Sequence, residues 1–472
     1  MANSLHRPAW SQAIAEPAAE FPLTSLKILA GTIPEQLRGT LYRNGPGRLQ
    51  RGGQQAGHWF DGDGAVLAVH FSETGATATY RYVQTAGYQQ ESAADAYLFP
   101  NYGMTAPGPF WNSWGKDPKN AANTSVLPLP DKLLALWEGG HPHALDLHDL
   151  RTLGGDRLSG LTKKAPYSAH PKIDCGTGKI YNFGVELGLQ TKINLYQSDE
   201  TGKIQQQGQI PLSEPSIIHD FSLAGPYLVL LVPPVRLNLL RILAGFSCFS
   251  GSATWKPELG TEIIIVDAHS LTPIARAETD PWYQWHFANG YGAGEEIVIE
   301  IVRYSDFPTT NQNLDEISHG YLKTPALGLL WRLRLDARTG KLLEQSQICD
   351  RACEFPVVPR HQVGQSWRNT YMTVHRDNRE AEGELFGAIG RYDRQTEQLI
   401  LADMGEGCYP SEPIFAPAAA YSEEGWILTV VYDGNQNRSE LRIYDARLET
   451  ELCRLELPRV IPHSFHGAWK PA

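Results

Sequence analysis

The stretch Asp336-Ala337-Arg338-Thr339-Gly340 is the pattern from which the expected fold of this chain follows. It is a short polar turn that begins with an acidic residue. An apolar segment precedes it, and a second segment able to return as a strand follows it. Asp and Gly are typical of tight turns, because an Asp side chain bonds nearby backbone and Gly accepts unusual φ angles. The stretch therefore predicts a β-hairpin.

The same arrangement recurs along the whole chain, seven times at intervals of roughly 50–75 residues. Each copy fits the turn between the two outer strands of a four-stranded blade. Such turns are common in any β protein, but regular repetition on this scale favours an all-β, seven-bladed propeller. The other six copies are Glu73-Thr74-Gly75, Asp146-Leu147-His148-Asp149, Asp199-Glu200-Thr201-Gly202, Asp267-Ala268-His269-Ser270, Asp393-Arg394-Gln395-Thr396 and Asp445-Ala446-Arg447-Leu448.

Most other signals are also strands, such as Gly39-Thr40-Leu41-Tyr42-Arg43 and Glu262-Ile263-Ile264-Ile265-Val266. Helical periodicity is limited to the segments near Leu237–Phe249 and Ala93–Phe99. No internal boundary is visible. We expect residues 1–20 to be an N-terminal arm and residues 21–472 to be a single propeller domain that carries the activity.

The composition is that of a globular protein, with 472 residues, 42% of them hydrophobic, and a net charge of −11. This acidic balance argues against a nucleic-acid partner. Residues 1–21 lack the pattern of a secretory signal, and no apolar run reaches the length of a transmembrane helix. A cytoplasmic protein is therefore expected. Its six cysteines, including Cys349 and Cys353, are expected to be reduced packing residues.

Four histidines stand in short apolar or aromatic contexts: His170, His219, His286 and His466. Taken singly, a histidine is more often a surface or core residue than a metal ligand. If these four converge, they form an all-imidazole site that suits Fe(II), Zn or Cu. A ligating histidine usually donates its other N–H to a carboxylate or carbonyl. Three glutamates in similar settings could supply those carboxylates, namely Glu138, Glu354 and Glu412.

Nine short motifs, spread in order over nearly the whole chain, resemble those of the carotenoid cleavage oxygenase family, and most closely its cyanobacterial-type apocarotenoid oxygenases. They are Leu41-Tyr42-Arg43-Asn44-Gly45-Pro46-Gly47, Trp59-Phe60-Asp61-Gly62-Asp63-Gly64, Ala122-Asn123-Thr124, Leu134-Ala135-Leu136-Trp137-Glu138-Gly139-Gly140, His170-Pro171-Lys172, His219-Asp220-Phe221, His286-Phe287-Ala288-Asn289, Glu354-Phe355-Pro356 and Phe465-His466-Gly467-Ala468-Trp469.

This resemblance implies a propeller with one Fe(II) on its axis, short helices and loops capping one face, and O₂ as co-substrate. The four histidines named above correspond to the family's iron ligands, and the three glutamates to the carboxylates that orient them. Thr124 corresponds to a residue that crowds an open coordination position. The chain departs from the family at Ser464, where many relatives have Gly. Ser tolerates positive φ less well, so the shape of that loop could differ.

A polyene substrate requires an apolar tunnel and a route from lipid. Residues next to the predicted metal ligands are expected to line the tunnel: Trp137, Ile217, Trp285 and Phe465. The segment 236–249 is apolar but too short to span a bilayer, which suggests a peripheral membrane patch. The alternative is a buried helix that caps the propeller. The patch would comprise Leu237, Leu239, Leu240, Ile242, Leu243, Phe246 and Phe249.

The resemblance implies a dioxygenase that cleaves one C=C bond of an apocarotenoid, expected at the 15,15′ position, to give retinal-type aldehydes. Eccentric cleavage of full-length carotenoids is an alternative. Stilbene cleavage is less favoured, because Trp137 stands where stilbene cleavers tend to have lysine. A noncatalytic lipid- or protein-binding propeller and a hydrolase on a propeller scaffold are rivals from other classes, and a monomer is favoured.

Overall fold

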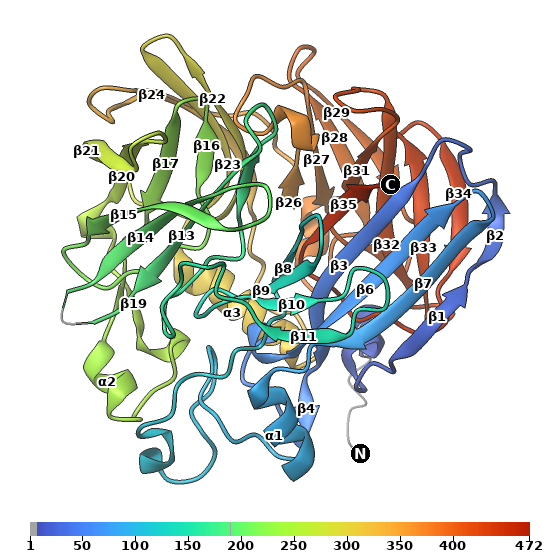
Figure 1. Ribbon diagram of the computed structural model, residues 1–472, viewed down its shortest axis with the longest axis horizontal. Helices are drawn as coiled ribbons and strands as arrows, with labels where there is room; N and C mark the ends of the chain where they lie inside the picture. The colour runs from blue at the N-terminus through green and yellow to red at the C-terminus, as the bar shows by residue number, and fades with distance from the viewer. Residues whose placement is uncertain (1–6, 189) are drawn as a thin grey trace.

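Seven antiparallel sheets arranged around a central axis make up the molecule (Figure 1). The computed structural model describes residues 7–188 and 190–472. Each sheet is one blade, and the first strand of most blades lies nearest the axis, where the inner strands of neighbouring blades contact one another. The predicted seven-bladed all-β propeller is confirmed.

Five blades have the expected four strands, which follow one another from the axis outward. The first two are β8 (Ser125–Pro128), β9 (Leu133–Leu136), β10 (His143–Leu145), β11 (Thr152–Gly155), and β12 (Lys172–Asp174), β13 (Lys179–Glu186), β14 (Lys192–Ser198), β15 (Ile204–Pro211). The next three are β16 (Ser222–Ala224), β17 (Tyr227–Val232), β20 (Thr261–Asp267), β21 (Thr272–Thr279); β22 (Tyr283–Ala293), β23 (Glu296–Tyr304), β24 (Leu329–Asp336), β25 (Leu342–Gln347); and β26 (Cys353–Val357), β27 (Asn369–Val374), β28 (Ala388–Asp393), β29 (Gln398–Asp403).

The two ends of the chain close the ring. The C-terminal strand β35 (Gly467–Pro471) is the innermost strand of a blade that continues with β3 (Gly39–Arg48), β6 (Asp63–Ser72), β7 (Gly75–Tyr82) and β1 (Phe21–Ser25). The neighbouring blade contains β30 (Cys408–Pro410), β31 (Ile414–Pro417), β32 (Gly425–Asp433), β33 (Arg438–Asp445), β34 (Glu451–Glu456) and β2 (Lys27–Gly31). Because β1 and β2 are consecutive, the N-terminal segment joins the outer edges of two blades.

All seven predicted turns join the third and fourth strands of their blades, as expected. In the turn at Asp336, the carboxylate accepts the backbone N–H groups of Arg338 and Thr339 over 3.1 and 2.8 Å. The aspartates of the other five Asp turns accept backbone N–H groups in the same way. At the remaining turn, the Ser72 hydroxyl accepts the N–H of Thr74. These side chains satisfy turn N–H groups that the strands leave unpaired.

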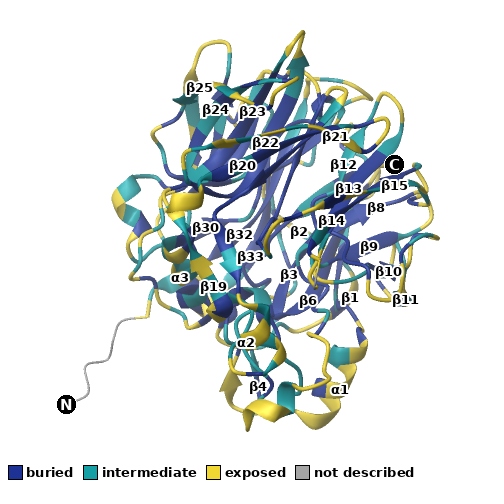
Figure 2. Cartoon of the chain, turned by 90° about the vertical axis from the view of Figure 1, so that its left-hand side faces the viewer, coloured by how far each residue is buried: buried dark blue, intermediate teal, exposed yellow. Residues whose placement is uncertain are grey.

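Short helices gather on one face of the propeller, around α1 (Ala86–Ala94), α2 (Leu239–Leu243) and α3 (Phe307–Ser318) (Figures 1 and 2). The helix expected near Leu237–Phe249 is α2, which is shorter. The helix expected at Ala93–Phe99 was wrong, because α1 ends at Ala94 and Asp95 adopts a left-handed conformation there.

Helix α3 was not predicted from the sequence, although the signals were present. Asp306 caps the helix by accepting the N–H of Thr309, and Pro308 lies in its first turn. Shorter elements complete the structure: the hairpins β4 (Gln50–Arg51) with β5 (Gln54–Gln55) and β18 (Val235–Leu237) with β19 (Ala253–Trp255), and the 3₁₀ turns η1 (Ala9–Ile14), η2 (Trp59–Asp61), η3 (Phe110–Ser113), η4 (Ser250–Ser252), η5 (Pro257–Leu259), η6 (Arg360–Gln362) and η7 (Asn378–Ala381).

Apolar side chains fill the spaces between blades, where the strands are coloured continuous dark blue in Figure 2. The N-terminal turn η1 also contributes, because Trp10 is fully buried and its indole N–H donates to the Gly383 carbonyl over 3.0 Å. All six cysteines are free. Within the described residues, no helix has both the length and the apolar character needed to cross a membrane.

Candidate metal centre

Each of the seven blades brings one predicted site residue to the axis. Thr124, His170 and His219 stand just before the inner strands β8, β12 and β16. The next two lie within inner strands, His286 in β22 and Glu354 in β26. The last two lie in the innermost segments of the blades that close the ring: Glu412 between β30 and β31, and His466 just before β35. Because every blade points its inner strand at the same axis, residues separated by up to several hundred positions in the sequence come together there.

The four histidines converge as predicted, and they are all buried. The Nε2 atoms of His170 and His219 are 3.0 Å apart, those of His219 and His286 3.3 Å, and those of His286 and His466 3.1 Å. Two imidazole nitrogens about 2.1 Å from one metal and at right angles to each other are about 3.0 Å apart. The spacing therefore matches neighbouring ligands of a single metal ion.

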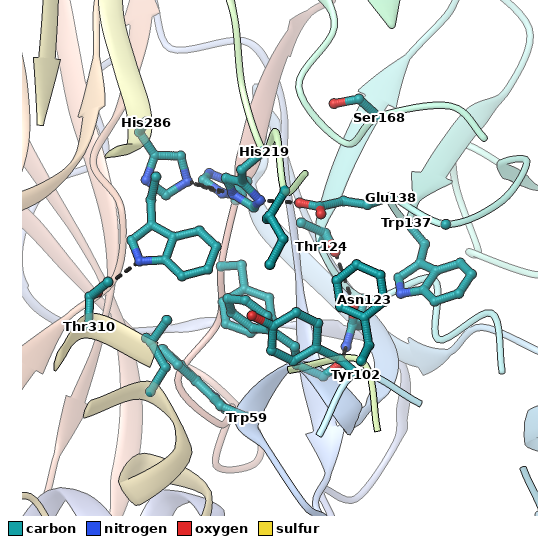
Figure 3. A pocket seen from close by; sticks show the side chains of 18 of the residues that line it. Trp59, Tyr102, Asn123, Thr124, Trp137, Glu138, Ser168, His219, His286 and Thr310 are labelled. Atoms are coloured by element: carbon teal, nitrogen blue, oxygen red, sulfur yellow. Dashed lines mark hydrogen bonds and ion pairs between the residues drawn. The ribbon is translucent and has the colours of Figure 1, made fainter. Parts of the chain in front are cut away.

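Three glutamates pair with three of these four rings. The Nδ1–H of His286 donates to Glu354 over 2.5 Å, and that of His466 donates to Glu412 over 2.8 Å. His219 Nδ1 pairs with Glu138, which points toward it in Figure 3. Because Nδ1 carries the proton in these rings, Nε2 presents a lone pair to the centre. Lone pairs held this close in a buried place repel one another, and a cation between them removes the repulsion.

Burial and the neighbouring rings hold the pKa of His170 and His466 well below the ordinary value, so both imidazoles are neutral. Burial alone would raise the pKa of Glu354, but His286, the Phe355 N–H and the Tyr304 hydroxyl outweigh it, and the pKa lies below its ordinary value. Burial raises the pKa of Glu412 to about 7, although Arg43 opposes the shift. Two of the four ligands, His170 and His466, are thus neutral, and Glu354 and Glu412 are held by hydrogen bonds.

The backbone near Glu354 departs from regular β-strand geometry at the point where its carboxylate meets His286. Phe355 has a φ of 53°, and its N–H donates to the Glu354 carboxylate over 2.7 Å. The register of β26 against β27 shifts between Glu354 and Val357. The Phe355 ring then packs 5.4 Å from His286 and 5.3 Å from His466, measured between ring centroids. A bulge of this kind re-aims a side chain, which at this position is the carboxylate that faces His286.

Arg43 is a site residue that the sequence did not single out, although it lies within one of the recognised motifs. It is buried, and its guanidinium donates to the carbonyl of Glu412, the carbonyl of Phe465 and the hydroxyl of Ser464. Ser464 does not have a positive φ, so the serine at this position causes no strain. Its hydroxyl instead becomes one of the acceptors for Arg43.

A cavity of about 650 Å³ lies beside the centre and is mostly apolar. The four predicted tunnel residues, Trp137, Ile217, Trp285 and Phe465, all line it, as does Thr124. Figure 3 shows Trp59 and Trp137 on different sides of this space, with His219 and His286 above both in the view. The Trp285 indole N–H donates to Thr310 over 2.8 Å, which ties the cavity wall to α3. A second cavity of about 540 Å³ contacts His170, His286 and His466.

The predicted membrane patch is divided by the fold. Leu240, Leu243 and Phe246 are exposed by 80, 74 and 63%. The others are wholly or partly buried, and Leu239, Ile242, Leu243 and Phe249 line the large cavity. Leu237 is buried in the core, so it does not belong to an exposed patch.

A second loop extends the exposed apolar surface. Phe110 packs 4.8 Å from Phe246 between ring centroids, and the Trp114 indole N–H donates to the Ala244 carbonyl over 2.8 Å. Trp111 and Trp114 are more than half exposed. We call Trp111, Trp114, Leu240, Leu243 and Phe246 the apolar rim. Leu243 belongs to the apolar rim and also lines the large cavity, so the apolar rim adjoins the cavity.

Comparison with known proteins gives consistent matches over nearly the whole chain. Residues 14–471 match the family described as retinal pigment epithelial membrane protein. The chain is 33% identical to the apocarotenoid-15,15′-oxygenase of Synechocystis sp., over 93% of this chain and 91% of that protein. It is 26% identical to the isoeugenol monooxygenase of Pseudomonas nitroreducens, over 93% of both chains. The structure of the cobalt-substituted Synechocystis oxygenase superposes with a TM-score of 0.87 at 30% identity, covering 98% of both chains.

Proposed function

Since this chain belongs to the carotenoid cleavage oxygenase family, the family of the retinal pigment epithelial membrane protein, and carries that family's four-histidine non-heme metal site, we propose that it is an Fe(II)-dependent dioxygenase of apocarotenoids. One iron per chain binds His170, His219, His286 and His466. The enzyme cleaves the 15,15′ double bond and releases retinal-type aldehydes.

The observation that carries this proposal is the four-imidazole cluster, three of whose rings line a mostly apolar cavity of about 650 Å³. Four neutral nitrogen ligands leave an iron its full positive charge and free coordination positions for O₂. When bound, Fe(II) supplies O₂ activation next to the alkene. The overall reaction adds both oxygen atoms of O₂ across the C=C bond, and the two new carbonyl groups account for all four electrons, so no external reductant is required.

The protein's own residues hold and shield this centre. Glu354 and Glu412 keep His286 and His466 in the tautomer whose Nε2 faces the metal. Glu138, whose side chain is 38% exposed, does the same for His219 at the cavity wall. Thr124 is fixed by its hydroxyl, which donates to Asn123, and crowds one coordination position. Aromatic side chains exclude water from the space that the polyene occupies.

The apocarotenoid substrate is favoured by two features. The relative with 33% identity acts on apocarotenoids by name, whereas the isoeugenol enzyme is more distant at 26%. Trp137 faces the cavity where a phenol-binding enzyme of this family would be expected to place a lysine. Eccentric cleavage of a full-length carotenoid uses the same centre and is the second candidate.

The apolar rim supplies the route from lipid. Its leucine and aromatic side chains suit the interfacial region of a bilayer, where Trp and Leu insert without crossing. Since Leu243 belongs to both the apolar rim and the cavity lining, a polyene can pass from the membrane into the cavity without entering water.

The test is anaerobic reconstitution with Fe(II), followed by incubation with an apocarotenal in detergent under air. Absorbance and mass spectrometry identify the products. We expect two aldehydes that require both iron and O₂, with masses that place the cut at 15,15′. Aldehydes of other masses would show that the enzyme cleaves a different double bond. Bound iron without any product would reject apocarotenoids as substrates.

A further inference from the structure

Part of the wall of the large cavity away from the predicted ligand set is polar, in a lining that is mostly apolar. Glu384 lines it, and the Tyr409 hydroxyl donates to Glu384 Oε2 over 2.6 Å. Among the described residues, Glu384 Oε1 has no hydrogen-bond partner in the protein. His375 lines the same cavity, and its ring packs 4.5 Å from that of Phe386, two residues beyond Glu384. The contact with Phe386 therefore places His375 beside the segment that carries Glu384.

His375 is buried at 5% exposure, and its Nδ1 has no hydrogen-bond partner among the described residues. Nδ1 is enclosed by protein atoms, so a molecule in the cavity can reach only the other ring nitrogen, Nε2. The burial that lowers the pKa of His375 to about 4 keeps the imidazole neutral, and in one of its two tautomers Nε2 carries the proton and can donate it. Glu384 offers an acceptor.

The N-terminal segment packs against this part of the cavity wall. The Trp10 indole N–H donates to the carbonyl of Gly383, and the His463 ring donates to the carbonyl of Trp10 over 2.9 Å. His463 also lines the cavity. These contacts anchor the part of the wall that carries Glu384 to the N-terminal segment and to His463.

We propose that Glu384 and His375 form a subsite that binds a hydroxyl group on one end of the polyene, so that the enzyme selects hydroxylated end groups over hydrocarbon ones. A hydroxyl donates to Glu384 and accepts the imidazole N–H of His375. A carbonyl can only accept, and a hydrocarbon ring leaves both protein groups unpaired. This inference rests on the proposed function, since it takes the cavity to be the site for the polyene.

The test compares two apocarotenals of equal length, one with a hydroxylated ring and one without. Affinity is measured by quenching of tryptophan fluorescence under anaerobic conditions, and kcat/KM is measured under air. We expect wild-type protein to favour the hydroxylated compound by about 10-fold or more, because one well-made buried hydrogen bond to a charged group has that effect. Equal affinities for the two compounds would overturn the proposal.

Two variants locate the preference. In Glu384→Gln, an amide N–H₂ replaces one carboxylate oxygen while the other oxygen still accepts from Tyr409. In His375→Phe, the polar nitrogens are lost while the ring remains. Either variant should reduce the preference to about 2-fold or less. The matched controls are Glu382→Gln, which is exposed, and His143→Phe, which removes another buried histidine with an unpaired Nδ1 outside the cavity. Both controls should retain the preference.

The affinity measurement separates this inference from the proposed function. In one outcome, iron-loaded protein cleaves neither compound and yet binds the hydroxylated one more tightly, with a preference that is lost in Glu384→Gln. That result would support the subsite and reject the proposed cleavage reaction. If both compounds are cleaved and the preference survives in Glu384→Gln and His375→Phe, the subsite fails and the reaction stands.

Discussion

Arg43 lies directly behind Glu412, with its Nη1 donating to the Glu412 carbonyl over 2.7 Å and standing 3.8 Å from the Glu412 carboxylate. Both side chains are buried, so this cation is the counter-charge of the carboxylate that orients His466. Burial lowers the pKa of Arg43 to about 10, which still leaves it charged at neutral pH.

Arg43→Met should weaken iron binding about 10-fold or more and lower the stability of the fold by about 3–5 kcal/mol. The variant leaves a buried carboxylate without its cation and removes the donors that fix residues 464 and 465. Metal analysis after titration with a chelator and thermal unfolding measure the two effects. The exposed Arg447→Met is the control. Unchanged iron affinity in Arg43→Met would contradict this role.

His286→Ala should lose iron and cleavage activity while the propeller stays folded. One ligand of four is removed, and the substituted side chain contributes little to the large cores between the blades. Iron content by elemental analysis and far-UV circular dichroism make the measurement. His269→Ala, at an exposed turn, serves as control. If His286→Ala keeps one iron per chain, the assignment of this histidine as a ligand is wrong.

A buried group of four charges holds the helical cap to the propeller. Lys119 Nζ lies 3.0 Å from Asp63 and 2.8 Å from Glu91, and Arg51 lies 2.7 Å from Asp63. Lys119→Met leaves two carboxylates facing a single cation. We expect a loss of about 3–5 kcal/mol, since breaking a buried ion pair strands the remaining charge. Thermal or urea unfolding measures the change.

The control for this variant is Lys164→Met. Lys164 pairs with Asp117 over 2.8 Å, but both side chains are about three-quarters exposed. Exposed pairs of this kind contribute about 0–1 kcal/mol. Equal losses in the two lysine variants would show that burial of the four-charge group does not matter for stability.

Buried neutral histidines should make the fold sensitive to mild acid. Burial and His141 lower the pKa of His143 from 6.5 to about 4. Between these two values the unfolded chain binds more protons than the folded one, so stability is fully present above pH 6.5 and falls as the pH drops toward 4. His143→Phe should therefore flatten this part of the stability curve.

The measurement is thermal unfolding from pH 7 to pH 4 for wild type and His143→Phe. Each unit of pKa depression corresponds to about 1.4 kcal/mol, so the two curves should diverge by about 2–3 kcal/mol over this range. Parallel curves would mean that His143 is protonated equally in both states.

The apolar rim should govern binding to lipid. Replacing Leu240 and Phe246 with Ser should reduce liposome partitioning several-fold and leave cleavage of detergent-dispersed substrate intact, because neither residue lines the cavity. Sedimentation with vesicles measures partitioning. The control replaces Leu153 and Leu343, which are exposed by about half and lie on the outer strands β11 and β25. Equal loss in both double variants would show that general surface hydrophobicity is responsible.

Local chemistry makes much of this protein predictable from its sequence. The seven acidic turns depend on contacts within three to five residues, so their spacing predicts the number of blades without knowledge of long-range contacts. The motifs around His286, Glu354 and His466 are equally local, and their resemblance to the family's motifs predicts the ligands and the carboxylates that orient them.

Other features depend on contacts between blades, which join residues that no local pattern relates. The pairing of Arg43 with Glu412 spans 369 positions. Leu237 is buried and nearby Leu240 is exposed, a difference that depends on which residues pack against this short segment. A role for His375 can be inferred only because the folded chain places it in the wall of the cavity. Short-range patterns thus specify the blades and the ligand set, because each depends on neighbouring residues. The folded chain determines which carboxylate pairs with which ring and which residues line the cavity, because those contacts form only when distant blades close the ring.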